Sequence, residues 1–162
     1  YEFRARLAGE SKLDSRAKWD YGLLLLDKLI GNIVPVRFIT FALVGGIGVV
    51  VHLAAVTVLF TLLKTPFLPS QALAAFVAMT TNFALNNVFT YSDMRLRGIK
   101  WLRGWLSFIV ACSLGLMANV GVAAYLFELK AGWTMAALTG IVVGAVWNYA
   151  TTSVYTWGVP KR

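Results

Sequence analysis

Four long stretches of the sequence contain no charged residue, and they constrain the fold more than any other feature. They cover residues 38–63, 68–91, 105–127 and 133–157. A bilayer core of about 30 Å requires roughly 20 apolar residues in helical form. Backbone groups in lipid must also be satisfied within the chain, which favours helices. We therefore predict an all-α membrane protein with four transmembrane helices.

The composition supports this prediction. Hydrophobic residues make up 59% of the 162 residues and charged residues only 14%, whereas a soluble domain has roughly 45–50% and about 25%. These values exclude a water-soluble fold, a disordered chain and a secreted disulfide scaffold. Cys112 is the only cysteine and His52 the only histidine, so neither an internal disulfide nor a metal site is expected.

The links between the stretches are short and predict two helical hairpins. Residues 65–69 contain two prolines between the first and second stretches, and residues 128–132 separate the third from the fourth. Connections of this length join antiparallel neighbours.

The basic residues predict the orientation. Lys64 and Lys130 are the only basic residues on one side of the four stretches. The other side has thirteen: Arg4, Arg6, Lys12, Arg16, Lys18, Lys28, Arg37, Arg95, Arg97, Lys100, Arg103, Lys161 and Arg162. By the positive-inside rule, both termini and the middle loop are expected in the cytoplasm, most simply at a bacterial inner membrane. The net charge of +8 then indicates an anionic membrane surface as partner, not nucleic acid.

The two predicted hairpins repeat each other. Residues 82–91 align with residues 148–157 at an offset of 66, with identities or aromatic exchanges at most of the matched positions. The first and third stretches align more weakly at an offset of 67, which pairs Phe41 with Phe108, Gly48 with Gly115 and His52 with Asn119. Copies with the same orientation should be related by an axis along the membrane normal.

Residues 13–36 have a different character. Trp19, Leu23, Leu26 and Ile30 fall near one helical face, while charged residues interrupt the apolar ones. The segment is too charged to span a bilayer, so we predict an amphipathic interface helix on the cytoplasmic surface. A soluble helix packed against another domain is the alternative. Because the chain begins without Met in a polar, basic stretch, we expect it to be part of a longer protein.

Asparagines within the predicted helices are candidate binding residues. An amide in hydrocarbon is costly without a partner, so Asn82, Asn86, Asn87 and Asn148 should face the interior of the bundle. Interhelical hydrogen bonding is the reading that we favour. The alternative is a polar groove that contacts a lipid phosphate, a sugar or a headgroup.

The remaining motifs narrow the function. Gly45, Gly46 and Gly48 lie inside an apolar helix with no preceding strand, so they predict close helix packing and not a nucleotide loop. No carboxylate lies in the four stretches, which argues against a proton-coupled exporter. The cluster Arg95, Arg97, Lys100 and Arg103 could either hold a phosphate or anionic headgroups, or only determine topology.

Two motifs carry a family resemblance for residues 37–159. Arg37-Phe38 leads into Val44-Gly45-Gly46, and residues 82–89 read Asn-Phe-Ala-Leu-Asn-Asn-Val-Phe, with a weaker copy at Asn148. On these residues the region resembles the GtrA-like family of membrane proteins. The chain has His52 and Asn87 where members more often have Asn and Arg. The resemblance implies the movement or handling of polyprenyl-phosphate sugars in cell-surface polysaccharide synthesis.

The first twelve residues carry another motif. Arg6, Gly9, Ser11 and Lys12 stand at the spacing Arg-x-x-Gly-x-Ser-Lys. This segment resembles the closing motif of family-2 glycosyltransferases, in particular dolichol-phosphate mannose synthases and their bacterial polyprenyl-phosphate relatives. The resemblance implies that Arg6, Ser11, Lys12 and, less directly, Arg4 contact substrate phosphates.

Together these features predict the membrane part of a glycosyltransferase. The chain contains no Asp-x-Asp, so no catalytic residue is assigned within it, and Mg²⁺ or Mn²⁺ is expected in a separate catalytic domain. We predict that residues 1–12 end that domain, that residues 13–36 form the interface helix, and that residues 37–159 form the transmembrane domain. The expected reaction transfers mannose or glucose from a nucleotide sugar to a polyprenyl or dolichyl phosphate. A flippase for the lipid-linked sugar is the first alternative, and a purely structural anchor or fusion partner is the second. A homo-oligomer is left open.

Overall fold

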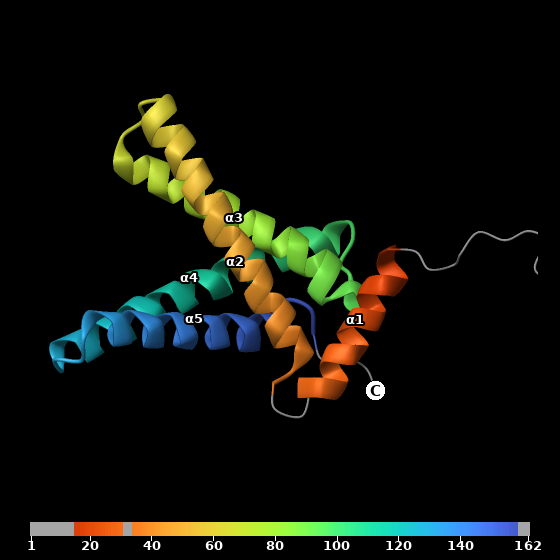
Figure 1. The fold of residues 1–162 in the computed structure, drawn as a ribbon. Coiled ribbons are helices and arrows are strands. Elements are labelled where there is room, and N and C mark those ends of the chain that lie inside the picture. The colour runs from red at the N-terminus through yellow and green to blue at the C-terminus, as the bar shows by residue number, and fades with distance from the viewer. Residues whose placement is uncertain (1–14, 31–33, 159–162) are drawn as a thin grey trace, which may run out of the picture. The chain divides into compact units, whose positions relative to one another are not determined.

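A computed structural model describes residues 15–30 and 34–158, and every element within these ranges is a helix (Figure 1). The chain divides into two units, Tyr1–Ile39 and Thr40–Arg162. The first contains α1 (Ser15–Ile30) and the beginning of α2 (Val36–Val56). The second contains the rest of α2 and the other elements. These are η1 (Thr57–Leu62), α3 (Phe67–Leu85), η2 (Asn86–Thr90), η3 (Ser92–Met94), α4 (Ile99–Glu128) and α5 (Trp133–Tyr155).

The helix predicted within residues 13–36 is present as α1. Its charged side chains Lys18, Asp27 and Lys28 are exposed, and so are the apolar side chains of Leu24 and Leu29. Exposed apolar side chains of this kind fit a helix that meets lipid or another surface. The position of α1 on the membrane surface stays a prediction.

Among the residues that the structure describes, three helices are long and apolar enough to cross a bilayer. They cover Val36–Leu62, Phe67–Thr90 and Ile99–Glu128 and contain 27, 24 and 30 residues. This finding confirms an all-helical integral membrane protein. The fourth predicted stretch forms α5, whose 23 residues carry no charge. Helix α5 is not among the three, so the fourth span remains a prediction.

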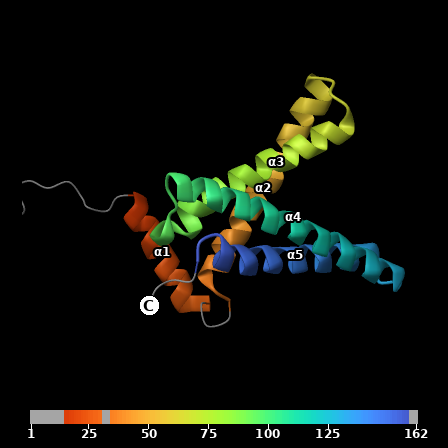
Figure 2. The ribbon, with the colours of Figure 1, turned by 180° about the vertical axis from the view of Figure 1, so that it is seen from behind.

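The helices pair as antiparallel hairpins, as the short links predict. Both views show α2 beside α3 and α4 beside α5 (Figures 1 and 2). Each turn places one lysine in the left-handed region, Lys64 with φ 55° and Lys130 with φ 61°. These lysines are 66 residues apart, so the sequence repeat continues through the turns.

One helix boundary differs from the prediction. Helix α4 begins at Ile99 and not near Trp105, so Lys100 and Arg103 lie on its first two turns. The absence of charge defines the part of a helix that can lie in lipid, but a helix can extend beyond that part where charged side chains reach polar surroundings. The middle loop is therefore shorter than the sequence predicts.

The buried core of the second unit is aromatic. It consists of five side chains: Phe41, Phe83, Tyr91, Phe108 and Trp157. They come from α2, from α3 and the turn after it, from α4 and from the residues after α5, so one cluster joins the two hairpins. Aromatic pairs at such distances contribute about 0.5–1.5 kcal/mol each beyond their buried area.

The aromatic contacts follow the repeat. The rings of Phe41 and Tyr149 lie 5.7 Å apart, and the matching pair Phe108 and Phe83 lies 5.6 Å apart. Tyr91 stacks on its own repeat partner Trp157, with a centroid distance of 4.0 Å and an interplanar angle of 7°. Equivalent residues that contact each other lie near the axis that relates two copies. The structure therefore supports a pseudo-two-fold relation between the hairpins.

Candidate functional site

The segments at one end of the hairpins are joined through the amide of Asn87. We call this end, where α3 ends, α4 begins and α5 ends, the basic end. Asn87 Oδ1 accepts a hydrogen bond from Leu96 N at 2.8 Å and one from Trp157 Nε1 at 3.2 Å, while Asn87 Nδ2 donates to Leu96 O at 3.1 Å. The side chain is 3% exposed. One buried amide therefore joins α3, the loop before α4 and the segment after α5.

The backbone of this region departs from a regular α-helix. Residues 86–90 form a π-helical turn, in which Tyr91 N donates to Asn86 O at 2.8 Å. Within the turn, Asn86 Nδ2 donates to Asn82 O at 2.9 Å, and Thr90 Oγ1 donates to Asn86 Oδ1 at 2.7 Å. Single π-helical turns frequently occur at functional sites, and this one places both Asn86 and Asn87 in the interior.

The end of α5 is anchored by polar and aromatic contacts. Trp157 is stacked between Tyr91 and Phe83. The hydroxyl groups of Thr156 and Ser107 lie 3.2 Å apart, within hydrogen-bond distance. The last turn of α5 is thereby fixed against the first turns of α4.

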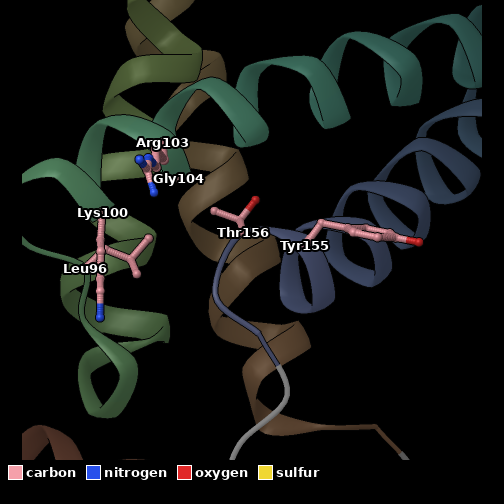
Figure 3. A pocket seen from close by; sticks show the side chains of 6 residues that line it. All are labelled: Leu96, Lys100, Arg103, Gly104, Tyr155 and Thr156. Carbon is pink, nitrogen blue, oxygen red and sulfur yellow. The ribbon is translucent and has the colours of Figure 1, made fainter.

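A polar pocket lies between these two fixed elements. It is about 250 Å³ in volume and is lined by Leu96, Lys100, Arg103, Gly104, Tyr155 and Thr156. Figure 3 shows Lys100 and Arg103 extending from α4 on one side, Thr156 on the other, and the ring of Tyr155 turned away from the two basic side chains. Ligand pockets for drug-sized molecules are roughly 300–1,000 Å³, so this pocket fits a smaller group.

The electrostatics of the pocket favour an anion. Helix α4 has no acidic residue in its first turn and no side-chain cap, although the positive end of the helix dipole is normally offset by negative charge. Lys100 and Arg103 add two cations there. Among the described residues, no carboxylate forms an ion pair with either of them. Arg95 and Arg97 are exposed in the preceding loop and do not line the pocket.

The structure gives Asn82 and Asn148 matching positions. A Cβ atom at Gly48 of α2 would overlap the Asn82 amide, and a Cβ atom at Gly115 of α4 would overlap the Asn148 amide. Oδ1 of each asparagine is buried and has no hydrogen-bond partner among the described residues. The two glycines are 67 residues apart and the two asparagines 66, so both hairpins use the same close approach.

The predictions for the asparagine and glycine residues are therefore confirmed only in part. Asn86 and Asn87 are both buried, but only Asn87 forms hydrogen bonds between different segments, as the interhelical interpretation predicts. The hydrogen bonds of Asn86 stay within its own helical segment. Contact of the four asparagines with a lipid or headgroup stays a prediction. Close packing is confirmed at Gly48. At Gly45 and Gly46 a Cβ atom would have no neighbour within 4 Å, so the described part of the chain shows no close packing at these two positions.

The residues predicted to contact substrate phosphates lie outside the described part of the chain. These are Arg4, Arg6, Ser11 and Lys12. Conversely, the sequence does not identify Leu96, Tyr155 and Thr156 as neighbours of Lys100 and Arg103. The sequence does contain one indication. The repeat makes Trp157 the equivalent of Tyr91, so the end of α5 should lie on the same side of the bundle as the end of α3.

The comparisons with known proteins agree with this architecture. The family model of the GtrA/DPMS transmembrane domain matches residues 40–157. The chain belongs to the GtrA/DPMS transmembrane-domain family. The matched range covers most of the second unit, including the aromatic core, the Asn87 contacts and the pocket. No curated protein sequence matches the chain.

Proposed function

We propose that the chain is the membrane portion of a polyprenyl- or dolichyl-phosphate glycosyltransferase. The observation that carries this proposal is the match of residues 40–157 to the GtrA/DPMS transmembrane domain. In this proposal the enzyme transfers mannose or glucose from a nucleotide sugar to a lipid phosphate on the cytoplasmic face of the membrane. The helices anchor the enzyme and position the lipid acceptor.

The proposal assigns phosphate contacts and metal binding to different groups of residues. The proposal assigns Arg6, Ser11, Lys12 and Arg4 to phosphate contacts at the membrane plane, where basic side chains bind phosphate oxygens well. The carboxylates that hold Mg²⁺ or Mn²⁺ against the nucleotide diphosphate belong to the catalytic domain and not to this chain. The basic end, with its pocket and four basic residues, supports a role for the membrane domain in handling an anionic lipid.

A transfer assay on the full-length protein tests the proposal. The solubilised protein is incubated with polyprenyl phosphate, Mg²⁺ or Mn²⁺ and a panel of radiolabelled nucleotide sugars. We expect lipid-extractable label from one sugar, which also identifies the donor. If the intact protein gives no label from any donor, the glycosyltransferase proposal fails.

Substitution of Lys12 tests the residue assignment. Lys12→Ala in the full-length protein removes a cation from the predicted phosphate contacts, so we expect KM for the lipid phosphate to rise about tenfold, as for the loss of one charge-assisted hydrogen bond. The helical content of the membrane domain should not change. Unaltered transfer kinetics would contradict the assignment of Lys12.

A flippase for polyprenyl-phosphate-linked sugar is the second candidate. The observation that favours it is the repeat, because two copies related by an axis along the membrane normal are a recurring plan of transporters. Protein in liposomes that contain a fluorescent polyprenyl-phosphate sugar should then move the lipid between leaflets. Movement equal to that in protein-free liposomes would exclude this function.

A further inference from the structure

The pocket between α4 and α5 is not explained by the packing of the fold. The Asn87 amide and the Thr156–Ser107 contact each satisfy their own groups within the chain. Lys100 and Arg103 are exposed, and no described carboxylate pairs with either of them. Like charges three residues apart on a helix also repel each other. Two exposed cations at the positive end of a helix dipole therefore line one open cavity.

We propose that this pocket binds a phosphomonoester group. Lys100 and Arg103 supply the positive charge, and the rest of the pocket is lined by Leu96, Gly104, Tyr155 and Thr156. At about 250 Å³, the pocket is below the range typical of drug-sized ligands and has room for a single phosphate group, whose lipid chain would extend out of the open side. The proposal rests on the proposed function only in naming polyprenyl phosphate as the lipid source.

Asn87 acts as a positioning residue for this site. Its amide holds Leu96, which lines the pocket, and Trp157, which follows the lining residue Thr156. Both sides of the pocket are thereby fixed to the end of α3. A preformed site avoids part of the entropy cost of ordering the loop when the anion binds.

The competing explanation is that the two cations only offset the negative end of the α5 dipole. Cations near a helix C-terminus are stabilising, and Tyr155 and Thr156 mark that end of α5. On this explanation, removal of the cations would lower stability in the absence of any ligand. On the phosphate-site proposal, removal would abolish the response to phosphate instead.

The test compares two double variants of the purified chain that lose the same charge. Lys100→Gln/Arg103→Gln changes the pocket, and Arg95→Gln/Arg97→Gln changes the exposed loop beside it. Each is titrated in detergent micelles with polyprenyl phosphate, with inorganic phosphate, and with phosphatidylglycerol as a phosphodiester control. Binding is followed by the rise in Tm and by ³¹P line broadening.

We expect polyprenyl phosphate to bind the wild-type chain and the loop variant alike, and the pocket variant at least about tenfold more weakly. Lys100→Arg should keep the affinity, because it keeps the charge and a donor. The same pattern with inorganic phosphate alone would support the pocket and identify free phosphate as the ligand.

Three results would overturn the proposal. One is equal loss in both double variants, which indicates general attraction by the basic end. Another is unchanged binding in the pocket variant. The third is a lower Tm of the pocket variant without ligand together with an unchanged response to phosphate. Because these readouts involve no sugar transfer, failure of the pocket and failure of the glycosyltransferase proposal are distinguishable.

Discussion

At the scale of single residues, the close approach of Asn82 to Gly48 and of Asn148 to Gly115 determines how each hairpin packs. Small residues let helix backbones approach each other in membranes. Here the space above each glycine is filled by an amide of the neighbouring helix. The buried Oδ1 atoms have no described partner, so the amides contribute mainly by fitting their sites. The sequence predicts both glycines and both asparagines as equivalent pairs, but not that each asparagine contacts the glycine of its own hairpin.

Alanine at these glycines should therefore destabilise the protein. The added methyl groups in Gly48→Ala and Gly115→Ala would overlap the Asn82 and Asn148 amides. Overpacking costs about 1–3 kcal/mol, which exceeds the gain of about 1 kcal/mol in helix propensity. Denaturant unfolding in micelles, followed by circular dichroism, measures the change.

The matched control is Gly46→Ala, in the same helix as Gly48. A Cβ atom there has no neighbour within 4 Å, so this variant should be unchanged or up to about 1 kcal/mol more stable. In addition, Asn82→Ala should relieve the overlap in the Gly48→Ala chain. Equal effects of Gly46→Ala and Gly48→Ala would show that the close approach does not matter.

Asn87 has the most hydrogen bonds to other segments of any described side chain at the basic end. Asn87→Leu keeps a similar volume but leaves the backbone groups of Leu96 and the indole Nε1 of Trp157 without their partner. Each buried polar group left unpaired costs about 1–3 kcal/mol. We expect a loss of about 2 kcal/mol or more, together with faster hydrogen exchange in residues 92–98.

Thr151→Val is the control for Asn87→Leu. The Thr151 hydroxyl bonds only to carbonyl groups of its own helix, at Trp147 and Asn148. Its removal should change stability by less than about 0.5 kcal/mol and leave exchange in the loop unaltered. If the two variants show the same loop exchange, Asn87 does not hold the loop.

At the scale of elements, the sequence predicts most helix positions because the physics of the bilayer dominates them. Stretches without charge correspond to α2 with η1, to α3 with η2, and to α5. The prediction fails at the start of α4, where Lys100 and Arg103 suggest a loop although the helix already includes them. It also cannot identify the pocket, because Thr156 is brought to Lys100 by contacts between residues far apart in the sequence.

The two hairpin turns offer a further test at this scale. Lys64 and Lys130 have positive φ angles, which cost a non-glycine residue about 1–2 kcal/mol, whereas glycine loses about 0.5–1 kcal/mol in backbone entropy. Lys64→Gly and Lys130→Gly should therefore each raise stability by about 0.5 kcal/mol. Denaturant midpoints measure the change, and Lys100→Gly inside α4 should instead lower stability.

At the scale of the whole molecule, the repeat and the charges make one combined prediction. Two equivalent hairpins require that α5 crosses the membrane as α3 does, although α5 is not among the three spans found. The buried Thr152 and Thr156, together with Trp157, are covered by the rest of the chain, so part of the polar surface of α5 need not meet lipid. We therefore expect four spans with both termini on the side of the basic end.

Cysteine labelling tests this topology. In a Cys112→Ala background, single cysteines are introduced as Lys64→Cys, Arg97→Cys, Lys130→Cys and Lys161→Cys, and an impermeant maleimide is added to intact cells of an expression host. We expect Lys64→Cys and Lys130→Cys to react at once, and Arg97→Cys and Lys161→Cys to react only after permeabilisation. Since α5 lies between positions 130 and 161, equal labelling of those two variants in intact cells would show that α5 does not span. The parallel repeat would then fail, and the flippase reading would lose the observation that favours it, whereas the pocket between α4 and α5 could still be tested by phosphate binding.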